Sequence, residues 1–265
     1  MVEGFTQRRL PLVQPTYFQR AIEDEYLSRM IVYIHQDSRG TYGSPRVHEA
    51  LKIEGINVGK KRVERLMQQQ GLQGRVVQVT RRQPGLRRFR ERGENLRLDS
   101  PEVSRSDQVW VSDITYIKVK DVYKYLIAIM DVYSRRIISG SLTETRTVND
   151  TLTVLKRAVS DRQPNAGLIF HTDRGIEYTG HEFKRILAQH GIRASVNRRG
   201  ICTDNGHMES FFHSLKAELI RGRKFNSMSE LRYSLNSYIN HFYNKKRLHS
   251  GIGYYSPIEY EKLAA

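Results

Sequence analysis

The segment QVWVSDITYIKV, residues 108–119, constrains the fold most, because it alternates like a strand and yet carries an aspartate in its middle. β-branched and aromatic side chains fill the segment, which favours a half-buried strand. Asp113 shares its face with Val111 and Thr115, because side chains alternate sides along a strand. Aspartate is almost never buried without a partner. The fold must therefore provide Asp113 with a partner, which can be an arginine or a metal ion.

The residues after this segment predict a mixed α/β domain. Two further strands are expected at 123–131 and 136–141, with a tight connection at Lys120 and Asp121. The later elements are expected to be a helix at 147–160, a short buried strand in LIFHTD, a helix at 181–190, a short strand near RASV and a strong helix in HMESFFHSLKAELI. Three strands followed by alternating helices and strands is the order of a ribonuclease H-like domain. We expect an α/β core with a mixed five-stranded sheet and flanking helices.

The N-terminal part predicts helices only. Residues 20–36 place apolar side chains at helical spacing, namely Ile22, Tyr26, Met30 and Ile34, with Leu27 and Ile31 widening the stripe. Short helices are expected at 46–54 and 60–70, and three basic residues begin the second one. This pattern is typical of a helix-turn-helix, whose second helix contacts DNA. The alternative is a plain helical hairpin with a solvated basic face.

The charge of the chain points to an anionic partner. Lys and Arg number 44 against 28 Asp and Glu, a formal net charge of +16. Nucleic acid is the first expectation, including RNA, and an anionic membrane surface is the second. No run of about 18 apolar residues predicts a membrane span, and the N-terminal segment lacks the apolar core of a secretory signal. The single cysteine, Cys202, excludes an internal disulfide and a multi-cysteine zinc site, and fits a reducing cytosol.

Basic residues gather in four stretches that we expect to contact DNA. Residues 75–105 are rich in arginine and predict an arm along the DNA backbone or, alternatively, a solvated linker. The tail YNKKRLHSGIGYYSP interleaves basic and aromatic residues, which favours a groove for partly unpaired DNA; the alternative is that its tyrosines complete the core. The residues concerned are Lys60, Lys61 and Arg62; Arg81, Arg82, Arg87, Arg88 and Arg90; Arg221, Arg223 and Lys224; and Lys245, Lys246, Arg247 and His249.

Two further carboxylates accompany Asp113. Asp173 follows a buried strand at the edge where open α/β sheets bind ligands, and Glu209 lies in the first turn of a strong helix, two turns before Lys216. Each acid alone has a plain structural reading, as a partner of arginine, a turn cap or a helix-dipole charge. Together they can converge on one site. Hard oxygen ligands select Mg²⁺ or Mn²⁺, and two such ions would serve phosphoryl displacement.

Several strings resemble a known family. Between Asp173 and Glu209 lie 35 residues, which with Asp113 resembles the D,D(35)E signature of retroviral-integrase-like transposases. The chain is most similar to the OrfB transposase of the IS-three insertion-sequence family. The matching strings are TYGSPRVHEAL, VERLMQQQGL, VWVSDITYI, YLIAIMDVYSRRI, HTDRGIEYT, TDNGHMESFFHSLKAE and YINHFYNKKRLHSGIGYYSPIEY. They run in order over roughly residues 42–260, nearly the whole chain.

The resemblance implies a function and a set of roles. Asp113, Asp173 and Glu209 would be the catalytic triad that binds the metal ions, and Lys216 would contact DNA near the active site. The pair Asp204 and Asn205 matches the family's segment before the glutamate. The expected activity is metal-dependent cleavage and strand transfer at insertion-sequence ends. The chain departs from the family at two positions, where Gly206 stands for a frequent alanine and His207 is unusual.

The resemblance also implies partners. They are terminal-repeat and target DNA, further copies of the chain on that DNA, and the upstream-frame protein OrfA, fused or associated. OrfA carries a further helix-turn-helix and a coiled coil that we do not expect within these residues. The expected location is the bacterial cytoplasm, at the nucleoid when DNA is bound.

The expected domains are a helix-turn-helix-like region at 1–74, a basic linker at 75–105, the catalytic core at 106–222 and a basic helical tail at 223–265. Three other functions share features with this reading. A retroviral integrase would need a zinc domain that one cysteine cannot supply. A ribonuclease H-like nuclease would not require the basic segments, and a non-catalytic DNA-binding regulator would not require three intact acids.

Overall fold

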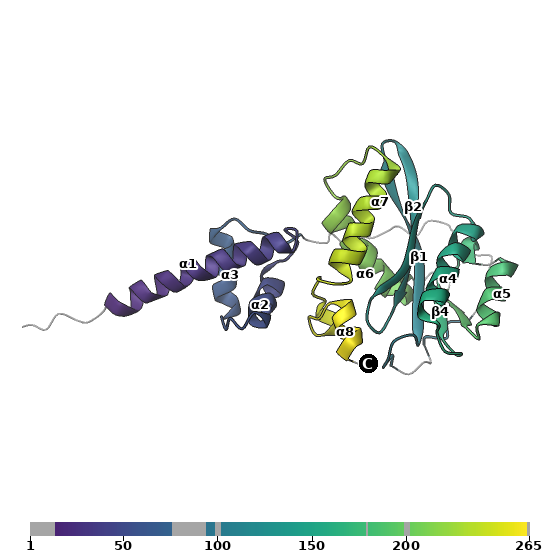
Figure 1. Cartoon of the computed structure of the whole chain (residues 1–265), viewed down its shortest axis with the longest axis horizontal. Coiled ribbons are helices and arrows are strands. Elements are labelled where there is room, and N and C mark those ends of the chain that lie inside the picture. The colour runs from purple at the N-terminus through teal and green to yellow at the C-terminus, as the bar shows by residue number, and fades with distance from the viewer. Residues whose placement is uncertain (1–13, 76–93, 99–101, 179, 199–201, 264–265) are drawn as a thin grey trace, which may run out of the picture. The chain divides into compact units, whose positions relative to one another are not determined.

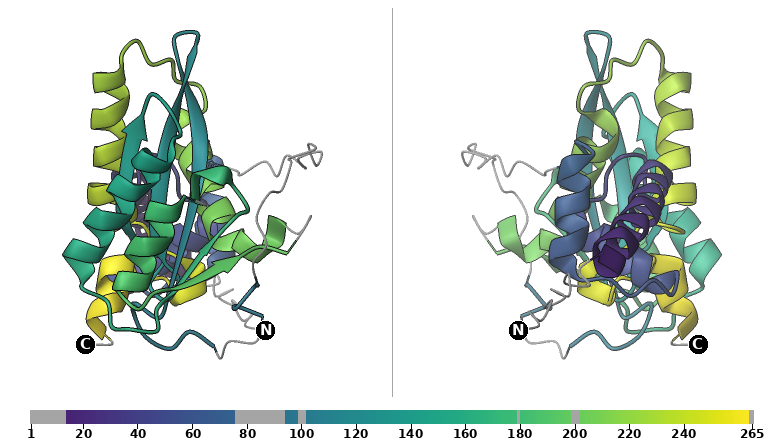
Figure 2. Two further views of the ribbon diagram at one scale, coloured as in Figure 1. Left: turned by 90° about the vertical axis from the view of Figure 1, so that its right-hand side faces the viewer. Right: turned by 90° about the vertical axis from the view of Figure 1, so that its left-hand side faces the viewer.

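The computed structural model describes residues 14–75, 94–98, 102–178, 180–198 and 202–263. The chain divides into two compact units, Met1–Arg75 and Val76–Ala265. Figures 1 and 2 show the helical first unit in purple and blue and the mixed second unit in teal to yellow. Among the described residues no helix combines the length and the apolar composition that a bilayer crossing requires.

The first unit is a three-helix cluster. It consists of α1 (Gln14–Asp37), α2 (Ser44–Ile53) and α3 (Lys60–Gln69). Its buried side chains come from all three helices: Leu27, Ile31, Ile34, Val47, Leu51, Val63, Leu66 and Met67. The prediction of an apolar stripe on α1 was wrong for the N-terminal half of the helix, because the side chains of Ile22 and Tyr26 are more than half exposed. The buried face is carried by Leu27, Ile31 and Ile34, where α2 and α3 pack.

The second unit is built on a five-stranded mixed sheet. The strands are β1 (Val109–Val119), β2 (Val122–Asp131), β3 (Ile137–Thr143), β4 (Ile169–Thr172) and β5 (Arg193–Val196), in the spatial order β3-β2-β1-β4-β5. The first three strands pair antiparallel, and β1, β4 and β5 run parallel. This is the ribonuclease H-like arrangement that the sequence predicted, including the two-residue connection at Lys120 and Asp121.

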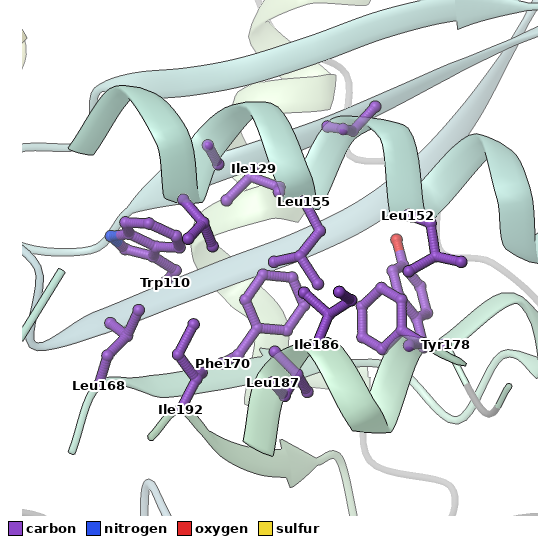
Figure 3. Close-up of a cluster of buried hydrophobic side chains, with 14 of the residues drawn as sticks. Trp110, Ile129, Leu152, Leu155, Leu168, Phe170, Tyr178, Ile186, Leu187 and Ile192 are labelled. Atoms are coloured by element: carbon purple, nitrogen blue, oxygen red, sulfur yellow. The ribbon is translucent and has the colours of Figure 1, made fainter. Parts of the chain in front are cut away.

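One face of this sheet is covered by α4 (Val148–Arg162) and α5 (His181–Gln189), on the right of Figure 1. Figure 3 shows the core between them and the sheet, in which side chains of β1, β2 and β4 interdigitate with the two helices. Its labelled members are Trp110, Ile129, Leu152, Leu155, Leu168, Phe170, Tyr178, Ile186, Leu187 and Ile192. Close packing on this face fixes the strands that carry Asp113 and Asp173.

The opposite side holds α6 (Gly206–Leu215), which continues into a π-helical segment η3 (Lys216–Ile220), and α7 (Met228–Asn236), which continues into η4 (Ser237–Tyr243). The expected apolar face of α6 is confirmed, because Met208, Phe212, Leu215 and Leu219 are all buried. A last helix, α8 (Pro257–Leu263), closes the described chain.

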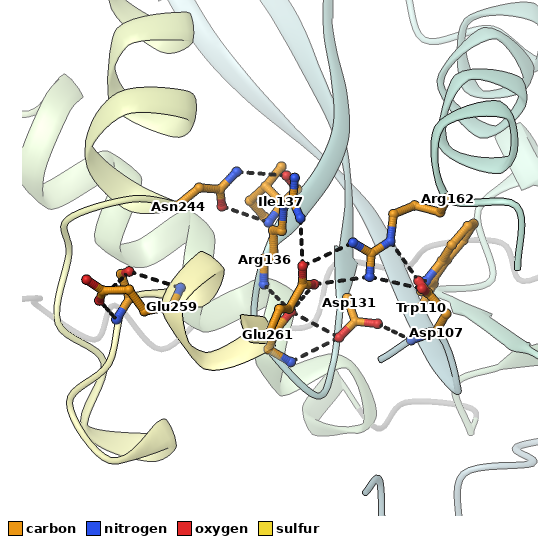
Figure 4. Close-up of polar contacts among 11 residues, drawn as sticks. Asp107, Trp110, Asp131, Arg136, Ile137, Arg162, Asn244, Glu259 and Glu261 are labelled. Carbon is orange, nitrogen blue, oxygen red and sulfur yellow. Dashed lines mark hydrogen bonds and ion pairs between the residues drawn. The ribbon is translucent and has the colours of Figure 1, made fainter. Parts of the chain in front are cut away.

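A polar cluster joins α8 to the sheet and to α4 (Figure 4). Glu261 of α8 accepts hydrogen bonds from Arg136 at 2.6 Å and Arg162 at 3.1 Å. Asp131, fully buried at the end of β2, accepts from the backbone N–H of Asp107 at 2.7 Å. Burial raises the pKa of Asp131, although its hydrogen bonds from Ser134 and Asp107 act in the opposite direction. These contacts hold the C-terminal residues against the core.

Candidate active site

The structure brings two of the three predicted acids into one hollow. Asp113 and Asp173 both line a cavity of about 190 Å³, together with Ile114, Arg146 and residues 174–178. Asp113 comes from the middle of β1, and Asp173 follows directly after β4. β1 and β4 are adjacent and parallel, paired at Val109–Ile169 through Val111–His171. The carboxyl end of β4 therefore faces the middle of β1, where Asp113 lies.

Backbone N–H groups orient both carboxylates. Asp113 Oδ1 accepts from Ile114 N at 2.8 Å, and Asp173 Oδ1 accepts from Gly175 N at 2.9 Å. A Cβ at position 175 would lie 2.8 Å from Asp173 Oδ1 and 2.5 Å from Glu177 Oε2. A side chain at position 175 would therefore displace one or both carboxylates, and glycine lets the Asp173 carboxylate keep its place.

A further acid and a basic residue stand at the same hollow. Glu177 is buried, and its Oε1 lies 3.4 Å from Arg146 Nη1. Tyr178 is also buried, and its hydroxyl lies 3.0 Å from Ser112 Oγ. Burial, together with the negative charges of Asp113 and Asp173, raises the pKa of Tyr178 well above its ordinary value. Tyr178 is therefore a neutral wall of the hollow. Neither Arg146 nor Glu177 was predicted from the sequence, because neither belongs to a spacing pattern that marks a site residue.

Glu209 lies in the first turn of α6 and does not line this hollow. Asn205 ties the start of α6 to the sheet. Its Nδ2 donates to the carbonyl oxygen of Ser112 at 3.1 Å, at the point of β1 where the pairing with β4 has ended. Asn205 Oδ1 is buried and has no hydrogen-bond partner among the residues that the structure describes. The helix that carries Glu209 is thereby anchored one residue away from Asp113.

Asp204, the residue before Asn205, also anchors the start of α6. It accepts from Arg198 Nη2 at 2.8 Å and from Asn95 Nδ2 at 2.7 Å. The hydrogen bonds from Arg198 are the main reason that the pKa of Asp204 falls to about 2. Asp204 is therefore a charged structural link between residues 95, 198 and α6. The family resemblance matched Asp204 and Asn205 to the segment before the glutamate. It did not predict these contacts.

The donor chemistry of the hollow fits a hard divalent cation in part. Asp113 and Asp173 offer carboxylate oxygens, the ligands that Mg²⁺ and Mn²⁺ prefer. Within the described ranges, no three His, Cys, Asp or Glu side chains form a group that could hold a metal ion. Of the three predicted acids, the structure therefore places Asp113 and Asp173 at the hollow, beside the Glu177–Arg146 pair, and Glu209 outside it.

Lys216 lies two turns beyond Glu209, where α6 passes into η3. Its Nζ is 4.9 Å from the ring centroid of Tyr116 on β1. This cation–π contact places a positive charge beside the strand that carries Asp113.

The other basic residues divide by exposure. Lys60, Lys61, Arg221, Arg223, Lys224, Lys245 and Lys246 are exposed. Arg62 is held by acids of α1, at 2.7 Å from Asp24 Oδ1 and 3.1 Å from Glu23 Oε2. These ion pairs join α3 to α1 and make Arg62 a structural residue of the first unit. The predicted arm residues Arg81, Arg82, Arg87, Arg88 and Arg90 lie outside the described residues.

The expectation that Arg247 and His249 line a surface groove was wrong. Their exposed fractions are 4% and 5%. The Arg247 guanidinium donates to Glu218 Oε1 at 2.7 Å, and Tyr238 donates to Glu218 Oε2 at 2.7 Å. The ring of Tyr243 is buried against Phe211 and His249. The sequence analysis assigned no role to Glu218, whose position between Ala217 and Leu219 was the signal that a buried cation would be needed.

Known proteins share this organisation. A family model described as an HTH-like domain matches residues 21–81, and models described as an integrase core domain match residues 103–202 and 209–263. A solved simian T-cell lymphotropic virus intasome, in complex with PP2A regulatory subunit B56 gamma, is 16% identical with a TM-score of 0.51. It covers 87% of this chain and 74% of the matched chain, and shows the shared fold.

Curated relatives also match at the sequence level, and three of them illustrate the range. The transposase for insertion sequence element IS904 of Lactococcus lactis is 33% identical over 92% of this chain and 96% of the relative. The insertion element IS600 uncharacterized 31 kDa protein of Shigella sonnei is 34% identical over 96% and 94%. Transposase InsF for insertion sequence IS3A of Escherichia coli K12 is 34% identical over 84% and 78%. With an HTH-like unit before an integrase core, the chain belongs to the IS3 family of insertion-sequence transposases.

Proposed function

We propose that this transposase cuts DNA at the ends of its insertion sequence and joins them to target DNA, with Asp113, Asp173 and Glu209 as the catalytic carboxylates. The observation that supports this most is the shared hollow of Asp113 and Asp173, two acids from adjacent parallel strands. Two like charges in one place repel, so a cation would stabilise them both.

Each residue at the proposed active site would have its own role. Asp113 and Asp173 would hold divalent cations, which activate the attacking oxygen and stabilise the leaving oxygen when bound. Glu209 would complete the ligand set when α6 and the DNA end are in place. Gly175 lets the Asp173 carboxylate approach its backbone N–H, and Asn205 holds α6 against β1. Arg146 would meet a phosphate at the mouth of the hollow.

The remaining parts of the proposal concern partners. The basic face at the start of α3, with Lys60 and Lys61, would contact the terminal repeats as part of the HTH-like unit. Several copies of the chain would act together on paired DNA ends. OrfA, fused or associated, would supply further end binding. Mg²⁺ would be the metal, and Mn²⁺ would substitute for it.

A strand-transfer assay on terminal-repeat DNA with Mg²⁺ tests the catalytic assignment. Asp113→Asn, Asp173→Asn and Glu209→Gln should each abolish cleavage and strand transfer, because each removes a charged ligand while keeping the shape of the side chain. The melting temperature and DNA affinity should stay close to those of the unmodified protein.

Asp161→Asn is the matched control. Asp161 is exposed near the end of α4, outside the hollow and the basic segments. Its neutralisation should leave strand transfer unchanged. Any of the three variants that retains strand transfer would be removed from the set of catalytic residues.

A further inference from the structure

We propose that the end of the β1–β2 hairpin is a stacking surface for unpaired bases of the DNA strand whose end enters the carboxylate hollow. This rests on the proposed function, since it assigns the neighbouring nucleotides of the same DNA end to named residues. Figure 1 shows the hairpin extending beyond the helices at the top of the second unit.

The hairpin carries two large aromatic side chains that the core does not use. Tyr116 is 50% exposed and Tyr123 is 53% exposed. The register pairs Tyr116 with Tyr125 and Lys118 with Tyr123, so both rings lie on one face of the hairpin. Their centroids are 5.2 Å apart with an interplanar angle of 82°. An edge-to-face pair leaves ring surface open to a third planar group.

Positive charge surrounds these rings. Lys216 Nζ lies 4.9 Å from the Tyr116 ring centroid. Lys118 and Lys120 are exposed at the turn, where Lys118 also pairs with Asp121 at 3.1 Å. The backbone N–H of Lys120 donates to the Phe225 carbonyl at 3.0 Å. This bond places the turn beside Phe225, and the exposed basic residues Arg221, Arg223 and Lys224 come directly before Phe225 in the chain. Aromatic rings among lysines and arginines match a single strand, whose phosphates need charge and whose bases need stacking partners.

The surface lies directly beside the hollow. Ile114 lines the hollow with Asp113, and Tyr116 is two residues further along β1 on the same face as Ile114. Two strand residues span roughly 7 Å, close to the spacing of neighbouring nucleotides in an extended strand. Asp113 itself lies on the alternate face of β1, so the link between the hollow and Tyr116 runs through Ile114 at the wall of the hollow. Lys216, which contacts the Tyr116 ring, comes from the helical segment that continues α6, the helix of Glu209, and gives a second link. A strand that leaves the hollow past Ile114 therefore reaches Tyr116 within one or two nucleotides.

Aromatic side chains among basic ones are the feature that a site for unpaired bases needs. In the sequence alone this feature favours the C-terminal tail. In the structure the tail's Arg247, His249 and Tyr243 are buried, so they offer no surface to a base. The hairpin meets the criterion with exposed rings. A duplex would not use them, because the faces of its internal bases are already stacked on one another.

Fluorescence anisotropy with an oligo-dT of about 15 nucleotides, a length sufficient for a single-strand site, tests the proposal. The measurement uses the full chain with Asp113→Asn, in EDTA, so that binding is read without cleavage. Tyr116→Ala and Tyr123→Ala should each weaken binding by about tenfold, since base–aromatic stacking contributes about 1–3 kcal/mol per base. Tyr123→Phe should bind as tightly as the parent, because the ring is kept.

Tyr233→Ala is the control, since Tyr233 is 78% exposed on α7, beside β3. Its affinity should not change. Unchanged oligo-dT affinity in Tyr123→Ala overturns the proposal and leaves the patch to a protein contact. An equal loss for blunt duplex DNA also overturns it. This assay measures binding without catalysis. A wrong assignment of the catalytic carboxylates would therefore change the strand-transfer result and leave this binding result unaffected.

Discussion

At the scale of single residues, Gly175 has the clearest consequence for the site. A methyl group there would lie 2.5 Å from Glu177 Oε2 and 2.8 Å from Asp173 Oδ1. Both atoms end flexible side chains, so they can move aside at small cost to stability. Asp173 cannot move without leaving the position that it shares with Asp113. Residue 175 therefore controls carboxylate placement more than folding.

We expect Gly175→Ala to lower strand transfer by at least tenfold, while the free energy of unfolding changes by no more than about 1–3 kcal/mol, the usual cost of overpacking. Strand-transfer rates and thermal unfolding check both parts. Gly206→Ala is the control, because a Cβ at Gly206 meets nothing within 4 Å. A Gly175→Ala protein with full activity would show that the Asp173 carboxylate need not stay where the structure places it.

At the scale of elements, the ion pair of Glu218 and Arg247 connects η3 to the segment after η4. Both side chains are about 95% buried or more, and Ser214 and Tyr238 complete their hydrogen bonds. Burial lowers the pKa of Arg247, but the charge and hydrogen bonds of Glu218, together with Tyr238 and Tyr243, raise it more, so the net shift is upward. The C-terminal tail is thereby fixed to the helix that carries Glu209 and Lys216.

Arg247→Met should destabilise the protein by about 3–5 kcal/mol, because it leaves the Glu218 carboxylate buried without its cation. Adding Glu218→Gln should recover at least half of that loss, since the remaining group is neutral and still accepts from Tyr238. Chemical denaturation of both variants measures the difference. If Arg247→Met kept its stability and instead bound DNA more weakly, Arg247 would be a DNA contact.

At the scale of the whole molecule, the basic residues behind the formal charge of +16 differ in whether they can reach DNA. Exposed lysines begin α3, whereas the neighbouring Arg62 is neutralised by Glu23 and Asp24. Ion pairs between side chains must break before such an arginine can bind a phosphate. Counting charges in the sequence therefore overestimates the number of phosphates that the protein can neutralise.

The double substitution Lys60→Ala and Lys61→Ala should weaken binding to all DNA sequences alike. It should also flatten the slope of log affinity against log salt by about 0.9 for each phosphate that the protein no longer neutralises. Arg62→Ala should lower the melting temperature of the first unit and leave the salt slope unchanged. A salt titration of affinity separates the two. Weaker binding confined to one DNA sequence would mean that the lysines read bases.

The sequence by itself determined the order of strands and helices in the second unit, because strand alternation and helical apolar spacing are local properties of the chain. It also singled out Asp113 and Asp173, since an acid inside a strand and an acid at a strand end are local anomalies. The tertiary structure decided which basic residues stay exposed. Arg62 and Arg247 look like Lys60 and Lys246 in the sequence, and only distant partners, Asp24 and Glu218, distinguish them. The exposed hairpin tyrosines were likewise decided by tertiary structure, because a ring's exposure depends on which helices reach it. The pairing of β1 with β4 then placed two acids 60 residues apart in one hollow.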